Sequence, residues 1–118
     1  MTLPTIFTSY YANKRIKDYN RYGISNICKV ENDFYLASPG VDLYNRYRSG
    51  SIDEAEYEKI YLRLINISED GILSYINCYV KHPAVFLCYE KLPKFCHRHI
   101  FAKWLRDRGF TVEELEYK

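Results

Sequence analysis

The residues best suited to chemistry lie close together between Cys88 and His99. This segment holds two thiols, a carboxylate, two imidazoles and a guanidinium. Apolar residues precede it and residues at helical spacing follow it, so we expect it to join the end of a strand to the start of a helix. A helix N-terminus has free N–H groups and a partial positive charge, which stabilise a thiolate or a bound anion. The segment is therefore the main candidate site.

Each thiol in this segment has two interpretations. Cys96 should lie at the helix start, where it serves as a nucleophile or as a ligand. Cys88 is a second nucleophile, or else a small apolar residue of the core, since unpaired cysteines pack well inside proteins. Arg98 is suited to holding a phosphate or carboxylate through two parallel hydrogen bonds.

The helical spacing separates the two histidines. His97 lies three and four residues before Ile100 and Phe101, so it should face inward, whereas His99 should face solvent with the basic residues of the same helix. His97 is then an acid–base group or a buried imidazole that bonds a carbonyl group. Glu90 is its acid–base partner or a solvated loop residue.

The same residues carry a resemblance to a known family. The pattern is Leu87-Cys88-Tyr89-Glu90, then Pro93, then Cys96-His97-Arg98 before an amphipathic helix. It resembles the hallmark of the family called domain of unknown function 488, and residues 7–13 are similar to the opening strand and turn of that family. The resemblance spans roughly residues 5–113. It implies presumed site residues, which are Cys88, Glu90, Cys96, His97, Arg98, Ser9, Tyr10 and Asn13, but it implies no reaction, because the activity of the family is unassigned.

The expected elements alternate between strands and helices. Short β-branched or apolar runs predict strands over residues 5–10, 25–30, 84–89 and 111–115. Helical spacing predicts helices over residues 13–22, 41–50, 69–80 and 96–108, and a further helix after a capping box of Ser51 and Glu54. The continuously apolar run at 84–89 is typical of a strand covered on both faces. Residues 34–40 should be irregular.

This alternation predicts a single three-layer α/β domain over residues 1–118, with a small, mainly parallel sheet flanked by helices. Two strands joined by the first helix should form a parallel βαβ unit. Ligands in such folds bind at the carboxyl ends of the strands. Residues 9–13 and 88–98 both follow strands, so Ser9, Tyr10 and Asn13 are expected to contact a ligand beside Arg98.

The composition and charge of the chain limit the kinds of partner that we expect. The chain has 118 residues, 47% hydrophobic and 27% charged, as in an ordinary folded domain. No signal peptide or membrane-spanning run is visible, so we expect a cytoplasmic protein with no membrane partner and no disulfide scaffold. The net charge is only +2, yet residues 91–108 hold six basic residues and one acidic residue. That patch favours a small anionic or nucleotide ligand, or is simply a solvated face. The 13 tyrosines reflect an interface or a compositional bias.

The sequence lacks the motifs that several well-known catalytic and phosphate-binding sites require. The sequence has no glycine-rich phosphate loop, no HExxH and no GxSxG, and no arginine lies six residues after Cys88 or Cys96, as a tyrosine-phosphatase loop requires. We expect no cofactor. A structural zinc site is disfavoured because His97 and His99 face different sides of the helix. Nucleic acid is an unfavoured partner, since no base-reading motif accompanies the basic residues. A homo-oligomer stays open.

The leading hypothesis is an enzyme or sensor that acts on a phosphorylated or nucleotide-like ligand. Arg98 and the helix start would hold the anion, His97 and Glu90 would be the acid–base pair, and Cys88 or Cys96 the nucleophile. One alternative is a non-enzymatic interaction module with a structural Cys-His-Arg cluster. A metal site is the other alternative.

Overall fold

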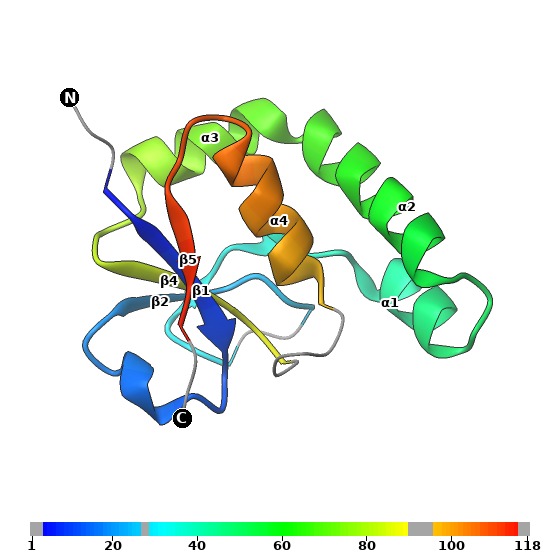
Figure 1. The fold of residues 1–118 in the computed structure, drawn as a ribbon, viewed down its shortest axis with the longest axis horizontal. Coiled ribbons are helices and arrows are strands. Elements are labelled where there is room, and N and C mark those ends of the chain that lie inside the picture. Colours follow the sequence, from blue (N-terminus) through cyan, green and yellow to red (C-terminus); the bar gives the residue numbers. More distant parts are fainter. Residues whose placement is uncertain (1–3, 27–28, 90–95, 116–118) are drawn as a thin grey trace.

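A five-stranded parallel sheet forms the centre of the computed structural model, which describes residues 4–26, 29–89 and 96–115. The strands are β1 (Ile6–Tyr10), β2 (Asn20–Gly23), β3 (Asn32–Asp33), β4 (Ala84–Cys88) and β5 (Val112–Glu114). Their order across the sheet is β3-β2-β4-β1-β5, and every pair is parallel (Figure 1). The predicted α/β class and parallel sheet are confirmed.

The middle strand is β4, and all five of its residues are buried. It pairs with β1 on one side and β2 on the other, and Cys88 lies in register with Tyr10. Alternate side chains point to opposite faces: Ala84 and Phe86 join the core under the helices, while Val85 and Leu87 join a smaller cluster on the other face. The apolar run of the sequence therefore reflects cover on both faces, as predicted.

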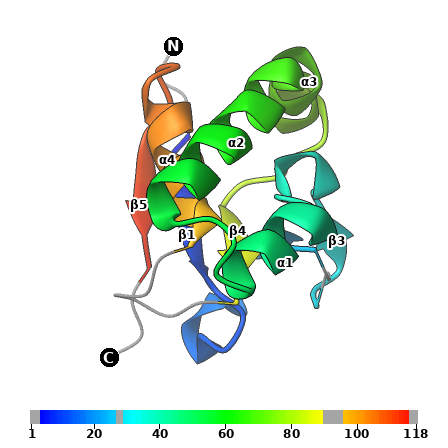
Figure 2. The same cartoon turned by 90° about the vertical axis from the view of Figure 1, so that its right-hand side faces the viewer.

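The four α-helices contribute their buried residues to the same core. They are α1 (Val41–Arg48), α2 (Glu54–Ile67), α3 (Glu69–Cys78) and α4 (His97–Arg106). In Figure 2, which faces α1 and α2, the strands lie behind the helices. The third layer is thin: on the far face, Ile16 of the 3-10 helix η1 (Lys14–Ile16) packs against Val85 and Leu87.

The N-terminal prediction is wrong after the first strand. Residues 13–22 form η1 and then β2, not one helix, and the strand expected over residues 25–30 is not found in its described part, residues 25–26 and 29–30. Ile16 and Tyr19 pack on the far face of the sheet, whereas Tyr22 enters the helix-side core. The spacing of Ile16, Tyr19 and Tyr22 therefore does not mark one face of a helix, because the chain passes from the far face of the sheet into the sheet itself between these residues. Residues 34–40 include the 3-10 helix η2 (Tyr35–Ala37).

The later elements match the predictions apart from their ends. The predicted capping box is wrong, because the Asp53 carboxylate accepts the Glu56 N–H at 2.8 Å and so caps α2 two residues further on. After α4 the chain reverses at Gly109, whose φ of +94° suits a residue without a Cβ. None of the helices in the described ranges has the length and apolar character that a bilayer crossing requires.

Candidate functional site: two cysteines beside His97 and Arg98

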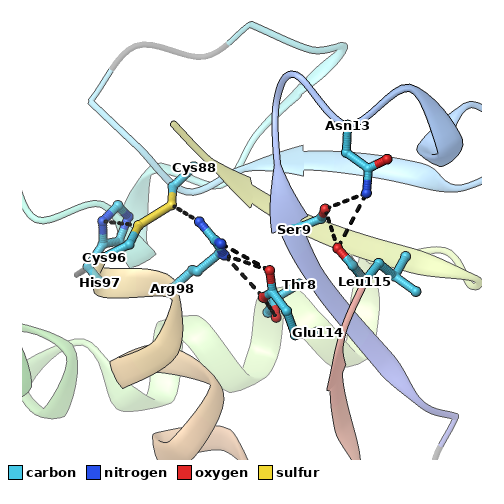
Figure 3. A network of polar contacts seen from close by, with 9 residues as sticks. All are labelled: Thr8, Ser9, Asn13, Cys88, Cys96, His97, Arg98, Glu114 and Leu115. Atoms are coloured by element: carbon cyan, nitrogen blue, oxygen red, sulfur yellow. Dashed lines mark hydrogen bonds and ion pairs between the residues drawn. A yellow bond between two sulfur atoms is a disulfide. The ribbon is translucent and has the colours of Figure 1, made fainter. Parts of the chain in front are cut away.

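Cys88 and Cys96 lie where the middle strand ends and the last helix begins. Cys88 is the final residue of β4, and Cys96 is the N-cap residue of α4. A disulfide joins the two sulfurs, and both side chains are almost fully buried (Figure 3). We expected no disulfide scaffold, and this bridge spans only eight positions of the sequence, so it is a local feature of the site.

His97 lies beside this pair and faces inward, as predicted. Its Nε2 contacts the carbonyl oxygen of Ile24, and its Nδ1 lies 3.8 Å from Sγ of Cys96. A carbonyl oxygen only accepts hydrogen bonds, so Nε2 carries the proton and Nδ1 presents a lone pair to the sulfur. Burial lowers the pKa of His97 to about 4, so the imidazole is neutral at pH 7.

Arg98 is fully buried and holds an ion pair under the sheet edge. Its Nε and Nη2 donate to the two carboxylate oxygens of Glu114 at 3.0–3.2 Å, and its Nη1 donates to Sγ of Cys88 at 3.0 Å. Thr8 adds a hydroxyl donor to Glu114 at 2.7 Å. The predicted anion clamp is thus already occupied by a carboxylate of the same chain, and these contacts argue against a second anion at Arg98.

Ser9, Tyr10 and Asn13, which were expected to contact a ligand beside Arg98, lie on two different faces of the sheet. Tyr10 joins the cluster, because the Arg98 guanidinium lies 5.9 Å from the centre of its ring. Ser9 and Asn13 do not: Ser9 donates to the carbonyl of Leu115 at 2.9 Å, and Asn13 donates to Ser9 Oγ at 2.9 Å. Asn13 also donates to the Leu115 carbonyl at 3.3 Å, so both side chains tie the β1 region to the chain after β5, on the side of β1 away from Arg98 (Figure 3).

A hollow opens beside the sulfurs and His97. This hollow has a volume of about 70 Å³ and is lined by Ser25, Tyr44, Tyr47, Tyr57, Cys88, Tyr89, Cys96 and His97. A larger hollow of about 330 Å³ shares four of these residues, namely Ser25, Tyr44, Tyr89 and His97, and extends along α1. The cluster is buried, yet it borders open space, so it is not sealed in hydrocarbon.

Sequence reasoning missed Glu114 and the tyrosine wall. Glu114 lies 16 positions from Arg98, and the pairing of β5 with β1 places it beside that side chain. The tyrosine excess was visible, but nothing in the spacing of the tyrosines indicated that four of them would line one hollow. His99 is half-buried, which corrects the expectation that it faces solvent. Glu90 lies outside the described residues.

The arrangement is suited to the chemistry of sulfur. A guanidinium next to Cys88 and a helix N-terminus at Cys96 both favour the thiolate over the thiol. Cys88, Cys96 and His97 also bring three ligand atoms within 4.8 Å of one another, as a group able to hold a metal ion.

No protein-family model, no curated protein and no solved structure matches this chain. The resemblance to the family called domain of unknown function 488 therefore stays a prediction.

Proposed function

We propose that this protein is a thiol-dependent enzyme or redox sensor in which Cys96 attacks and Cys88 resolves. The observation that carries the proposal is the pairing of these two sulfurs, with Arg98 bonded to one and the Nδ1 lone pair of His97 beside the other. In a reducing cytoplasm, the compartment we propose, disulfides are usually transient and catalytic or redox-sensing.

Cys96 is the better attacking thiol. It is 5% exposed against 1% for Cys88, and it caps α4, where the helix N-terminus stabilises negative charge. His97 Nδ1 lies 3.8 Å from this sulfur and is placed to accept a hydrogen bond from the thiol. Burial lowers the pKa of His97 to about 4, so the imidazole is neutral at pH 7 and presents that lone pair to the thiol.

Cys88 is suited to the resolving and leaving role. A thiol leaves faster when its thiolate is more stable, and Arg98 donates a charge-assisted hydrogen bond to this sulfur. Glu114 holds the guanidinium in place through two further nitrogens. Arg98 is therefore a positioning and charge-stabilising residue here, in place of the anion clamp that the sequence suggested.

The reaction with a low-molecular-weight disulfide shows which bonds form and break and where the electrons go. The Cys96 thiolate attacks one sulfur of oxidised glutathione, forms a mixed disulfide and expels one glutathione thiolate. The Cys88 thiolate then attacks Sγ of Cys96, forms the Cys88–Cys96 bond and expels the second glutathione thiolate. The protein loses two electrons and two thiol protons, and the oxidised glutathione becomes two thiols.

The alternative, a purely structural Cys-His-Arg cluster, predicts that the cluster is packed on every side. The described residues around it instead leave the tyrosine-lined hollow next to Cys96 and His97. This observation favours the thiol chemistry.

The test is a redox titration of the purified full chain. The protein is equilibrated in buffers of graded reduced and oxidised glutathione, its remaining thiols are alkylated, and peptides are identified by mass spectrometry. We expect one reversible two-electron transition that joins Cys88 to Cys96, and Cys96→Ser should abolish it.

Cys78→Ser is the matched control, because Cys78 is an exposed, unbridged cysteine on α3. It should leave the transition unchanged. A Cys88–Cys96 peptide that never forms at any glutathione ratio would overturn the proposal, as would a bridge that reducing agent opens only after the protein is unfolded.

A further inference from the structure

The three ligand atoms of the thiol site have the spacing of a tetrahedral metal centre. With zinc bonds of about 2.3 Å to sulfur and 2.0–2.1 Å to nitrogen, tetrahedral angles place sulfur and nitrogen about 3.6 Å apart. The distance between Cys96 Sγ and His97 Nδ1 is 3.8 Å, and Cys88 Sγ lies within 4.8 Å of both. Small side-chain adjustments would bring all three atoms onto one cation.

The two cysteines are far enough apart to hold a cation between them. Their Cα atoms lie 7.5 Å apart, and a shared zinc ion requires about 3.8 Å between two thiolate sulfurs. Reduction of the bond between the sulfurs frees the two side chains to move apart to that separation.

His97 is already oriented as a ligand. Metal-binding histidines usually donate their other ring N–H to a carboxylate or a backbone carbonyl, which fixes the tautomer and the ring plane. The Ile24 carbonyl does this for His97 through Nε2. The ring also packs against Tyr61 in a T-shaped arrangement, with centroids 5.4 Å apart, and its Nδ1 faces the Cys96 sulfur.

The charge of the reduced site suits a divalent cation. Two thiolates supply two negative charges, and the neighbouring Arg98 is balanced by Glu114 at 3.0 Å. Soft sulfur ligands with one imidazole favour zinc over the hard cations magnesium and calcium. A cation at this position would offset two buried negative charges that are otherwise costly.

From these observations, we propose that the reduced Cys88 and Cys96 thiolates and His97 Nδ1 bind one Zn²⁺ ion. Three protein ligands leave the fourth position to water, as in catalytic zinc sites. The 70 Å³ hollow borders all three ligands and has room for a water molecule. This inference rests on the proposed function in one respect: oxidation of the two thiols must release the metal, so Zn²⁺ and the disulfide exclude each other.

The experiment is a Zn²⁺ titration of the reduced, chelator-free full chain under anaerobic conditions, against a chromophoric competitor. Elemental analysis gives the stoichiometry. We expect one Zn²⁺ per chain for the reduced protein and none at this site for the oxidised protein. Loss of a residue that only holds a metal ligand in place costs roughly 10–100-fold in metal affinity, so Cys88→Ser, Cys96→Ser and His97→Gln should each weaken binding by about 100-fold or more.

Cys78→Ser and His99→Gln are matched controls, since both residues lie outside the three-ligand group, and they should bind Zn²⁺ as the wild type does. Co²⁺ gives an independent readout on unmodified protein: thiolate ligation produces a charge-transfer band that oxidation should abolish. This second measurement holds even if a cysteine variant fails to fold.

The outcomes separate the two proposals. Reversible formation of the Cys88–Cys96 bond without Zn²⁺ binding overturns the metal site and leaves the thiol function standing. Zn²⁺ binding at these ligands without a reversible redox transition overturns the thiol function alone. Binding that survives all three ligand variants is surface binding, and it contradicts the metal site.

Discussion

Two buried polar networks lie at the same end of the sheet, and they differ in what their atoms face. On the far face, Asn13, Ser9 and the Leu115 carbonyl bond to one another, and Asn13 also caps η1 by accepting the Arg15 N–H. On the helix side, Arg98 and Glu114 form a comparable framework, but the sulfurs and His97 beside it border a hollow.

The comparison shows which buried polar groups indicate a function. Each network ties β1 to the C-terminal segment, and by hydrogen-bonding alone either is a structural device. The helix-side network differs in holding thiols and an imidazole lone pair next to open space. A candidate functional site is therefore distinguished from a structural hydrogen-bond network by reactive atoms next to a cavity, and not by buried polar groups alone.

The largest effect should come from Arg98→Met. This change leaves Glu114 without its bidentate partner, and breaking a buried ion pair costs about 3–5 kcal/mol. The free energy of unfolding, measured by urea denaturation, should fall by that amount. Arg106→Met on the same helix is the control, because Arg106 is exposed and its guanidinium donates to a backbone carbonyl, that of Val112, and not to a buried carboxylate of the described residues. An equal loss of unfolding free energy in both variants would show that the ion pair of Arg98 with Glu114 contributes no more to stability than the exposed contact of Arg106.

The next effect should be a pH dependence that depends on His97. Burial holds its folded-state pKa near 4, below the ordinary 6.5, so the unfolded chain binds the proton more readily between these values. Stability is then fully present above pH 6.5 and declines as pH falls toward 4, by up to about 3 kcal/mol. Urea denaturation of the metal-free protein at several pH values measures this.

His97→Gln should flatten that decline. Burial also lowers the pKa of His99, so His99→Gln is the matched comparison. The half-buried side chain of His99 should account for less of the pH dependence. A wild-type profile indistinguishable from that of His97→Gln would mean that the imidazole is solvated, contrary to its contact with Ile24.

A smaller effect is expected on the far face. Asn13→Ala removes the N-cap of η1 and the bond to Ser9, which should lower the free energy of unfolding by about 1–2 kcal/mol. The glutathione transition of Cys88 and Cys96 and their metal affinity should not change, because the bonds of this network among the described residues go to Ser9, Leu115 and Arg15 and not to the cysteines. Asn77→Ala, at an exposed position of α3, is the control for stability. A shift in the thiol transition would show that the two networks are coupled.

The same contrast explains what could be predicted from the sequence. The end of the chain has strong local signals: a continuous apolar strand, an amphipathic helix and a glycine after it. These place Cys88, Cys96 and His97 correctly. The segment after β1 has no such signal, since Ile16 and Tyr22 pack on opposite faces of the sheet and β2 has only four residues. Tertiary packing decides its structure.

The partners of the site were the other part beyond prediction. Arg98 was identified as a candidate, but the role assigned to it depended on whether a carboxylate of the chain would reach it. Glu114 does so through the pairing of β5 with β1, a long-range contact that local spacing does not contain. The tautomer of His97 likewise depends on the carbonyl of Ile24, 73 positions away.

The central claim is that burial has not made Cys96 inert. The most direct measurement is the rate at which iodoacetamide alkylates each cysteine in the reduced, folded, metal-free protein at pH 7. Peptide mass spectrometry measures the labelling of each cysteine over time. The exposed Cys78 is the internal reference. We predict that Cys96 reacts faster than Cys78 and that His97→Gln slows the reaction of Cys96 alone. A Cys96 that stays unlabelled until urea unfolds the chain, while Cys78 reacts at once, would contradict it.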